Sequence, residues 1–122
     1  MEIGANNKNT AEYVVAQLFE NWIKKDWEEV NRYVQTTWLY RNGIDGFKNM
    51  FGSIDVAGYH IYGKEAVTDC RHEVDFRADI IFKGKVVMRY GKANCICETA
   101  EYTSDPKGIW GVNPISLLRW RK

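Results

Sequence analysis

The sequence predicts an α+β fold in which N-terminal helices pack on a curved, bulged antiparallel sheet. Three observations lead to this prediction. Apolar residues recur at three- and four-residue spacing through the first third of the chain, as in amphipathic helices. From Ile54 onward, apolar and polar residues alternate, as in half-buried strands. Short turns separate these strands, and strands joined by short connections pair antiparallel.

The first helix is expected from about residue 10 to Lys25, with Asn9 or Thr10 as its N-cap. Its apolar stripe comprises Val14, Val15, Leu18, Phe19, Trp22 and Ile23. The opposite side carries Glu12, Gln17, Glu20, Lys24 and Lys25.

A second helix is expected to start at Asp26, because Glu29 three residues later completes a capping-box pattern. Its buried stripe comprises Trp27, Val30 and Val34. The run Trp38–Tyr40 is expected to lie after the end of this helix, outside any helix. Residues 47–51 are expected to form one more short helix, with Phe47, Met50 and Phe51 in the core.

Four strands are then expected, at about 54–62, 65–82, 86–103 and 109–121. The predicted breaks between them are Gly63-Lys64, Lys83–Lys85 and Ser104–Gly108. Along the second strand, even positions from Ala66 to Phe82 are largely apolar with His72 among them, and odd positions are largely charged. The even positions are therefore expected to face the core.

The third strand changes phase, which predicts a one-residue bulge at Gly91-Lys92. Val86, Met88 and Tyr90 are expected to face inward before the bulge, and Ala93, Cys95 and Cys97 after it. With a three-residue turn, this bulge places Phe82 opposite Val86, Val74 opposite Cys95, His72 opposite Cys97 and Arg71 opposite Glu98.

Length and composition predict a single domain over residues 1–122, with a flexible segment at 1–9. Seventeen Lys and Arg against 16 Asp and Glu give a net charge of +1, too small to predict binding to nucleic acid or to a membrane surface. The chain shows no signal-peptide pattern and no apolar run near the ~18 residues that a bilayer requires. Its three cysteines are expected to be reduced thiols of a cytoplasmic protein.

Three segments resemble the NTF2-like (cystatin-like) superfamily, which includes ketosteroid isomerase and SnoaL-type polyketide cyclases. They are the helical opening Val14–Trp22, the segment Lys25–Val30, and the sequence Ile109-Trp-Gly-Val112. The resemblance implies a conical pocket between the helices and the concave face of the sheet, and a homodimer formed through the outer face. It implies no particular reaction, since this fold serves enzymes, scaffolds and transport factors alike. No segment matches the isomerase's catalytic pattern.

His72 is the main catalytic candidate, because an imidazole on an apolar face can act as a general base near neutral pH. A neutral, hydrogen-bonded core histidine is the alternative. Tyr40 is the second candidate, as a hydroxyl donor at the rim of the pocket, although Tyr and Trp are also ordinary residues at the edge of a core. Trp38, Tyr90 and Cys97 are expected to contact a small hydrophobic ligand.

No metal or cofactor is expected. Cys70, His72, Cys95 and Cys97 resemble a zinc ligand set, but alternate residues of a strand stand about 7 Å apart along it, whereas zinc ligands lie within ~2.3 Å of the ion. The charged positions of the second strand, Asp69 to Asp79, are interpreted as a solvated surface or a polar dimer interface.

Two functional hypotheses follow. The first is a non-catalytic, homodimeric module that binds a small molecule or a partner protein, and it is preferred because no acid/base pair is recognised on the inward faces. The second is a cofactor-independent isomerase, dehydratase or cyclase, with His72 as base and Tyr40 as its electrophilic partner.

Overall fold

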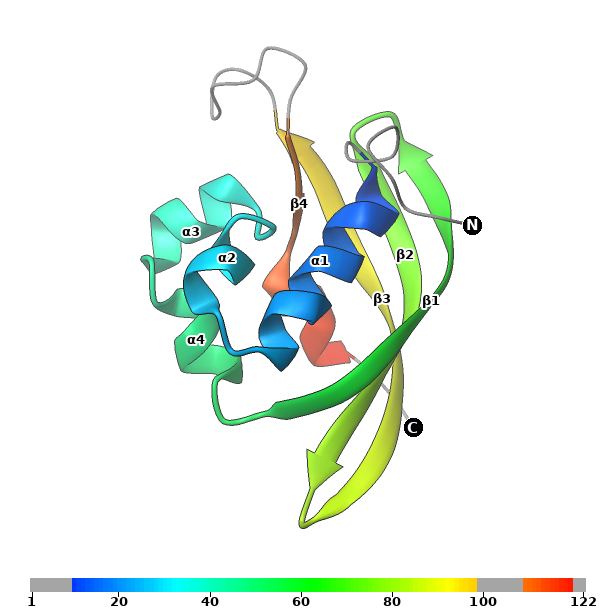
Figure 1. The fold of residues 1–122 in the computed structure, drawn as a ribbon. Helices are drawn as coiled ribbons and strands as arrows, with labels where there is room; N and C mark the ends of the chain where they lie inside the picture. The colour runs from blue at the N-terminus through cyan, green and yellow to red at the C-terminus, as the bar shows by residue number, and fades with distance from the viewer. Residues whose placement is uncertain (1–9, 99–108, 120–122) are drawn as a thin grey trace.

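The computed structural model describes residues 10–98 and 109–119, and it confirms the α+β class (Figure 1). In chain order the elements are α1 (Ala11–Ile23), α2 (Trp27–Asn31), α3 (Thr36–Asn42), α4 (Gly46–Phe51), β1 (Asp55–Thr68), β2 (Arg71–Phe82), β3 (Lys85–Glu98), β4 (Ile109–Val112) and the 3-10 helix η2 (Pro114–Arg119). The predictions for residues 1–9, for the turn at Ser104–Gly108 and for the ends of the last two strands fall partly or wholly outside the described residues.

The sheet is antiparallel, with strand order β1-β2-β3-β4. Figure 1 shows α1 crossing one face of the sheet, which we call the inner face, while α2, α3 and α4 gather beside α1 next to β4. The long strands β1, β2 and β3 bend and twist along their length, and the β2–β3 turn projects beyond the helices (Figure 1). The outer face is the opposite face of the sheet.

The N-caps of the first two helices follow local sequence rules. Thr10 is the N-cap of α1, since its side chain accepts a hydrogen bond of 3.2 Å from the Tyr13 N–H. Asp26 caps α2 by accepting from the Glu29 N–H at 3.3 Å, as expected. The predicted apolar stripe of α1 is buried except for Ile23, which is 36% exposed because it belongs to the last turn.

Helix α3 was not predicted, because Thr36 and Thr37 are poor helix formers. A distant carboxylate stabilises its first turn. Glu98 of β3 accepts from the Thr37 N–H at 2.9 Å and from the Thr37 hydroxyl at 2.7 Å. A negative charge at a helix N-terminus is favourable, so tertiary contact overrides local propensity here.

Helix α4 agrees with the prediction, with Phe47 and Phe51 buried and Met50 partly buried. The Trp22 ring of α1 lies 5.2 Å from both of these phenylalanine rings, measured between centroids. Its indole N–H donates to the Ile54 carbonyl at 3.0 Å. Trp22 therefore joins α1, α4 and the start of β1 in one core.

The first strand break was predicted at the wrong place. Gly63-Lys64 lies within β1, next to one of three register shifts between β1 and β2. A glycine in a strand marks either a turn or a bulge, and here it marks a bulge. The chain turns instead at Asp69-Cys70, so Ala66 belongs to β1 and Cys70 is exposed.

The predicted register between the next two strands was also wrong. Lys83 and Gly84 have φ angles of 52° and 78°, and two consecutive positive values form a two-residue turn. Phe82 therefore pairs with Lys85 rather than with Val86, and the register runs from there without a bulge at Gly91-Lys92.

This register moves the partners of the other predicted pairs. Val74 lies opposite Ala93, His72 opposite Cys95, and Arg71 opposite Ile96. Because side chains alternate along a strand, Val86, Met88 and Tyr90 lie on the outer face, not the inner face as expected.

The last predicted strand is shorter than expected. β4 ends at Val112, and Pro114 begins η2. Within β4, Gly111 lies so close to the α2–α3 connection that a Cβ there would meet the Gln35 backbone at 2.7 Å. The Trp-Gly-Val sequence thus serves close packing of β4 against this connection, where Val112 also bridges to Val34.

Candidate functional site

The structure brings His72 and Cys97 to one face of the sheet, both next to Trp110, but it separates them from Tyr40 and Tyr90. His72 lies on the inner face of β2, in register with the buried Cys95. Tyr40 is 93% exposed on α3, while Trp38 of the same helix is buried. Tyr90 lies on the outer face, away from His72, and Cys97 lies on the inner face beside β4.

The surroundings of His72 combine an aromatic contact with an unsatisfied nitrogen. The Trp110 ring lies 4.4 Å from the imidazole, between centroids, at an interplanar angle of 32°. The Nδ1 atom is buried and has no hydrogen-bond partner among the residues that the structure describes. The His72 ring therefore packs against Trp110, and its buried Nδ1 atom forms no hydrogen bond with any residue that the structure describes.

Glu12 of α1 lies near Cys95, the strand partner of His72. Helical periodicity predicted that Glu12 lies on the polar side of this helix. Its Oε1 atom is buried and lies 3.3 Å from Lys64 Nζ, without hydrogen-bonding geometry. Burial, and secondarily the charge of Glu12, raises the pKa of the Cys95 thiol to about 12. The raised pKa favours the neutral thiol at neutral pH, and Cys95 packs as a fully buried member of the core.

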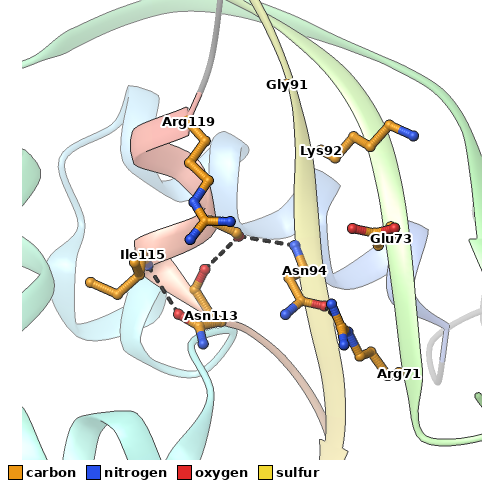
Figure 2. A pocket seen from close by; sticks show the side chains of 9 residues that line it. Arg71, Glu73, Gly91, Lys92, Asn94, Asn113, Ile115 and Arg119 are labelled. Atoms are coloured by element: carbon orange, nitrogen blue, oxygen red, sulfur yellow. Dashed lines mark hydrogen bonds between the residues drawn. The ribbon is translucent and has the colours of Figure 1, made fainter. Parts of the chain in front are cut away.

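A cleft opens elsewhere, between the outer face of the sheet and η2 (Figure 2). Its volume is about 310 Å³. The lining residues come from β2, from β3 and from the segment after β4; they are Arg71, Glu73, Gly91, Lys92, Asn94, Asn113, Ile115, Ser116 and Arg119. Polar and charged side chains predominate among them.

Hydrogen bonds between β3 and the start of η2 form one wall of the cleft. The Asn113 N–H donates to the Asn94 carbonyl at 2.8 Å, and the Asn94 N–H donates to Ser116 Oγ at 2.9 Å. Ser116 in turn donates to the Asn113 carbonyl at 2.6 Å, and the Ile115 N–H donates to Asn113 Oδ1 at 3.0 Å. These bonds hold η2 against β3 at the place where β4 would otherwise continue (Figure 2).

The cleft carries three cationic side chains and one carboxylate. Arg71 Nε donates to Asn94 Oδ1 at 2.9 Å, so the partner of this guanidinium is a neutral amide. Lys92 Nζ lies 3.9 Å from an oxygen of Asp75, at the limit of an ion pair. Neither the Arg119 side chain nor the Glu73 side chain has a hydrogen bond or ion pair within residues 10–98 and 109–119. The local charge is therefore positive.

Sequence reasoning placed Arg71 and Glu73 on a solvated face but did not find the cleft. The missing information was the position of η2, because the region after Val112 was expected to continue as a strand. Pro114 is the signal that can identify this change, since proline lacks the N–H that a ladder strand donates.

No family model, curated protein or solved structure matches this chain. None of the helices in the described ranges is long and apolar enough to cross a membrane. Within the same ranges, no three His, Cys, Asp or Glu side chains are grouped so that they can hold a metal ion.

Proposed function

We propose that this chain is a non-catalytic, NTF2-like module that binds a small polar molecule in the outer-face cleft. The cleft itself is the observation that carries the proposal. Its volume of about 310 Å³ is at the lower end of the ~300–1,000 Å³ typical of ligand pockets, and guanidinium, ammonium, amide and hydroxyl groups converge on it. These are groups that recognise and orient a ligand. They favour a polar ligand over the small hydrophobic ligand expected from the sequence.

Two structural features support the NTF2-like part of the proposal. Helices come first in the chain and a bent antiparallel sheet follows, with α1 lying across the inner face (Figure 1). The sequence Trp110-Gly-Val112 belongs to one of the segments that resemble this superfamily. In the structure, Gly111 and Val112 pack against the α2–α3 connection.

Two rim variants of η2 test the binding proposal. Ile115 lines the cleft and is 44% exposed, whereas Leu118 of the same helix is 53% exposed but does not line it. We expect Ile115→Trp to fill the cleft and to abolish binding of small polar molecules in a ligand-observed NMR screen. Leu118→Trp is the matched control and is expected to bind like the unmodified chain. Equal binding by both variants would contradict the proposed site.

Homodimerisation through the outer face is the second part of the proposal. The far end of this face exposes Tyr62, Ile81, Val86 and Met88 at 44–61%. Tyr62 stacks on Tyr90 at 6.4 Å between centroids, which extends the apolar surface across β1 and β3. The same face carries both Arg77 and Asp79, and a surface with both signs of charge is compatible with the self-complementary interface of a twofold dimer.

Sedimentation velocity tests this interface. We expect the unmodified chain to sediment as a dimer at micromolar concentration and Met88→Asp to sediment as a monomer, because the aspartate places a charge in a desolvated contact. The control Ile44→Asp changes an exposed residue (74%) between α3 and α4 and is expected to leave the dimer intact. A monomeric unmodified chain would contradict the dimer and leave the ligand proposal standing.

The enzymatic hypothesis keeps one specific supporting observation. Glu12 and His72 each carry a buried polar atom that lacks a hydrogen bond within the described ranges, and Glu12 is close enough to influence Cys95, the strand partner of His72. A carboxylate and an imidazole in one neighbourhood are a candidate acid/base pair. A bound molecule detected at His72, and not at the cleft, would favour this hypothesis.

A further inference from the structure

We infer that the ligand of the outer-face cleft is a small organic anion bearing a carboxylate or phosphate group, held between Arg71 and Arg119. This inference rests on the proposed binding function and specifies its ligand class. The argument depends on the charge of the lining residues, on the partners that they lack, and on the elements that hold them.

The lining residues carry a net positive charge that the neighbouring carboxylates do not balance. Arg71, Lys92 and Arg119 face one carboxylate, that of Glu73. In a folded protein, cationic side chains gathered in a cleft are commonly paired with carboxylates, yet Arg71 is paired with an amide and Lys92 holds Asp75 only at 3.9 Å. An anion entering the cleft would supply the missing counter-charge.

The two guanidinium groups come from separate and well-anchored elements. Arg71 begins β2, where its contact with Asn94 fixes the direction of its side chain. Arg119 ends η2, and the hydrogen bonds of Asn113 and Ser116 hold that helix to β3. In Figure 2 the Arg71 guanidinium lies beside Asn94, and the Arg119 guanidinium lies on the η2 side of the cleft, above Asn113. Planar guanidinium forks recognise carboxylate and phosphate oxygens in a bidentate manner, which is why arginine suits this role better than lysine.

Glu73 restricts the kind of anion that fits. A carboxylate beside the cations disfavours a ligand whose negative charge fills the whole cleft, and it can accept a hydrogen bond from a hydroxyl or ammonium group of the ligand. We therefore expect a compact organic anion with a donor group at one end. Glu73→Gln is expected to strengthen the binding of anions that lack such a donor, because it removes a repulsive charge.

Calorimetric titration of the full chain with four probes tests the inference. Succinate and inorganic phosphate are the anions, aspartate adds an ammonium donor, and succinamide is a neutral molecule of similar shape. We expect the organic anions to bind at least 10-fold more tightly than succinamide, with affinity falling as salt concentration rises. Comparison of succinate with phosphate then decides which of the two anionic groups the cleft prefers.

Arginine variants identify the residues responsible. Arg119→Gln and Arg71→Gln are each expected to weaken anion binding by about 10- to 100-fold, the range for loss of a charge-assisted hydrogen bond. Arg41→Gln, at an exposed position of α3, is the control and is expected to have no effect. Circular dichroism verifies that each variant is folded, and Arg119→Lys replaces Arg119→Gln if the latter is not.

The outcomes separate the two proposals. If succinamide binds as tightly as succinate, or if both arginine variants bind succinate normally, the anion inference is wrong while the cleft remains a binding site. If none of the four probes binds and the Ile115→Trp comparison also shows no difference, the proposed function itself is wrong.

Discussion

The two faces of β2 differ sharply in burial. On the inner face, Val74, Phe76 and Ala78 are at most 1% exposed, and the Phe76 ring lies 5.2 Å from Phe19 of α1 between centroids. On the outer face, Glu73 and Asp75 remain partly exposed, and α1 lies across the opposite face in Figure 1. The comparison indicates that the covered face supplies the stability of the fold, whereas the uncovered face supplies its candidate binding surfaces.

The largest expected effect is the loss of an inner-face aromatic ring. Phe76→Ala is expected to lower the free energy of unfolding by about 3–5 kcal/mol, because it leaves a cavity beneath α1. Glu65→Ala on the outer face is expected to change it by less than about 0.5 kcal/mol, since Glu65 is exposed and lies in register with Glu73. Urea denaturation measures both, and a comparable loss for the two variants would contradict the assignment of faces.

The next effect concerns the carboxylate that links β3 to α3. Glu98 is 7% exposed and accepts two hydrogen bonds from Thr37. Glu98→Ala is expected to cost about 2–3 kcal/mol of unfolding free energy, because two partly buried donors at the N-terminus of α3 lose a charged acceptor. Glu98→Gln retains an acceptor and serves as the control, with a smaller expected loss in the same urea experiment. Equal losses for the two variants would contradict the claim that the carboxylate charge of Glu98 stabilises the first turn of α3.

The buried thiol of the inner face makes stability depend on alkaline pH. The pKa of Cys95 is raised from 9.0 to about 12 in the folded chain, so between these values the unfolded chain releases a proton that the folded chain retains. Stability is then complete below pH 9 and falls by about 1.4 kcal/mol per pH unit above it. Cys95→Ala is expected to have a shallower decline than the unmodified chain in denaturation curves taken at pH 8, 9 and 10.

Cys70 serves as the comparison, because it is exposed at the β1–β2 turn. Cys70→Ala is expected to keep the alkaline decline of the unmodified chain. If Cys95→Ala retained the full slope, the thiol would not be the group that titrates.

The smallest expected effect is at the projecting β2–β3 turn. Lys83 has a φ angle of 52°, which asparagine adopts at lower cost than lysine. Lys83→Asn is expected to raise the unfolding free energy by about 0.5 kcal/mol, whereas Gly84→Ala, at a φ angle of 78°, is expected to lower it by about 1 kcal/mol. Thermal unfolding measures both changes, and a stabilising Gly84→Ala would contradict the two-residue turn.

The same contrast between local and distant interactions explains what the sequence could predict. The caps at Thr10 and Asp26 depend on contacts three residues apart, and both agree with local rules. The β2–β3 register depends on whether the turn has two residues or three, and alternation alone does not decide this. The apolar residues Val86 and Met88 were therefore predicted to face the core, with a bulge after them, although they lie on the outer face.

The candidate site was harder to predict because it depends on contacts far apart in the chain. Arg71 and Arg119 come from the start of β2 and the end of η2, and no local pattern relates them. The charges on β2 were recognised, but their role requires knowing that η2 lies beside β3. His72 was correctly expected on the inner face, whereas the pairing of Glu12 with Lys64 depends on how α1 lies across the sheet.

A ¹H–¹⁵N titration with succinate most directly tests whether ligand binds on the uncovered face of the sheet. The account predicts that the backbone amide signals of Asn94, Ser116 and Arg71 shift in a saturable manner while those of His72, Cys95 and Trp110 stay in place. Saturable shifts confined to His72 and its neighbours would contradict the account and place the binding site beneath α1.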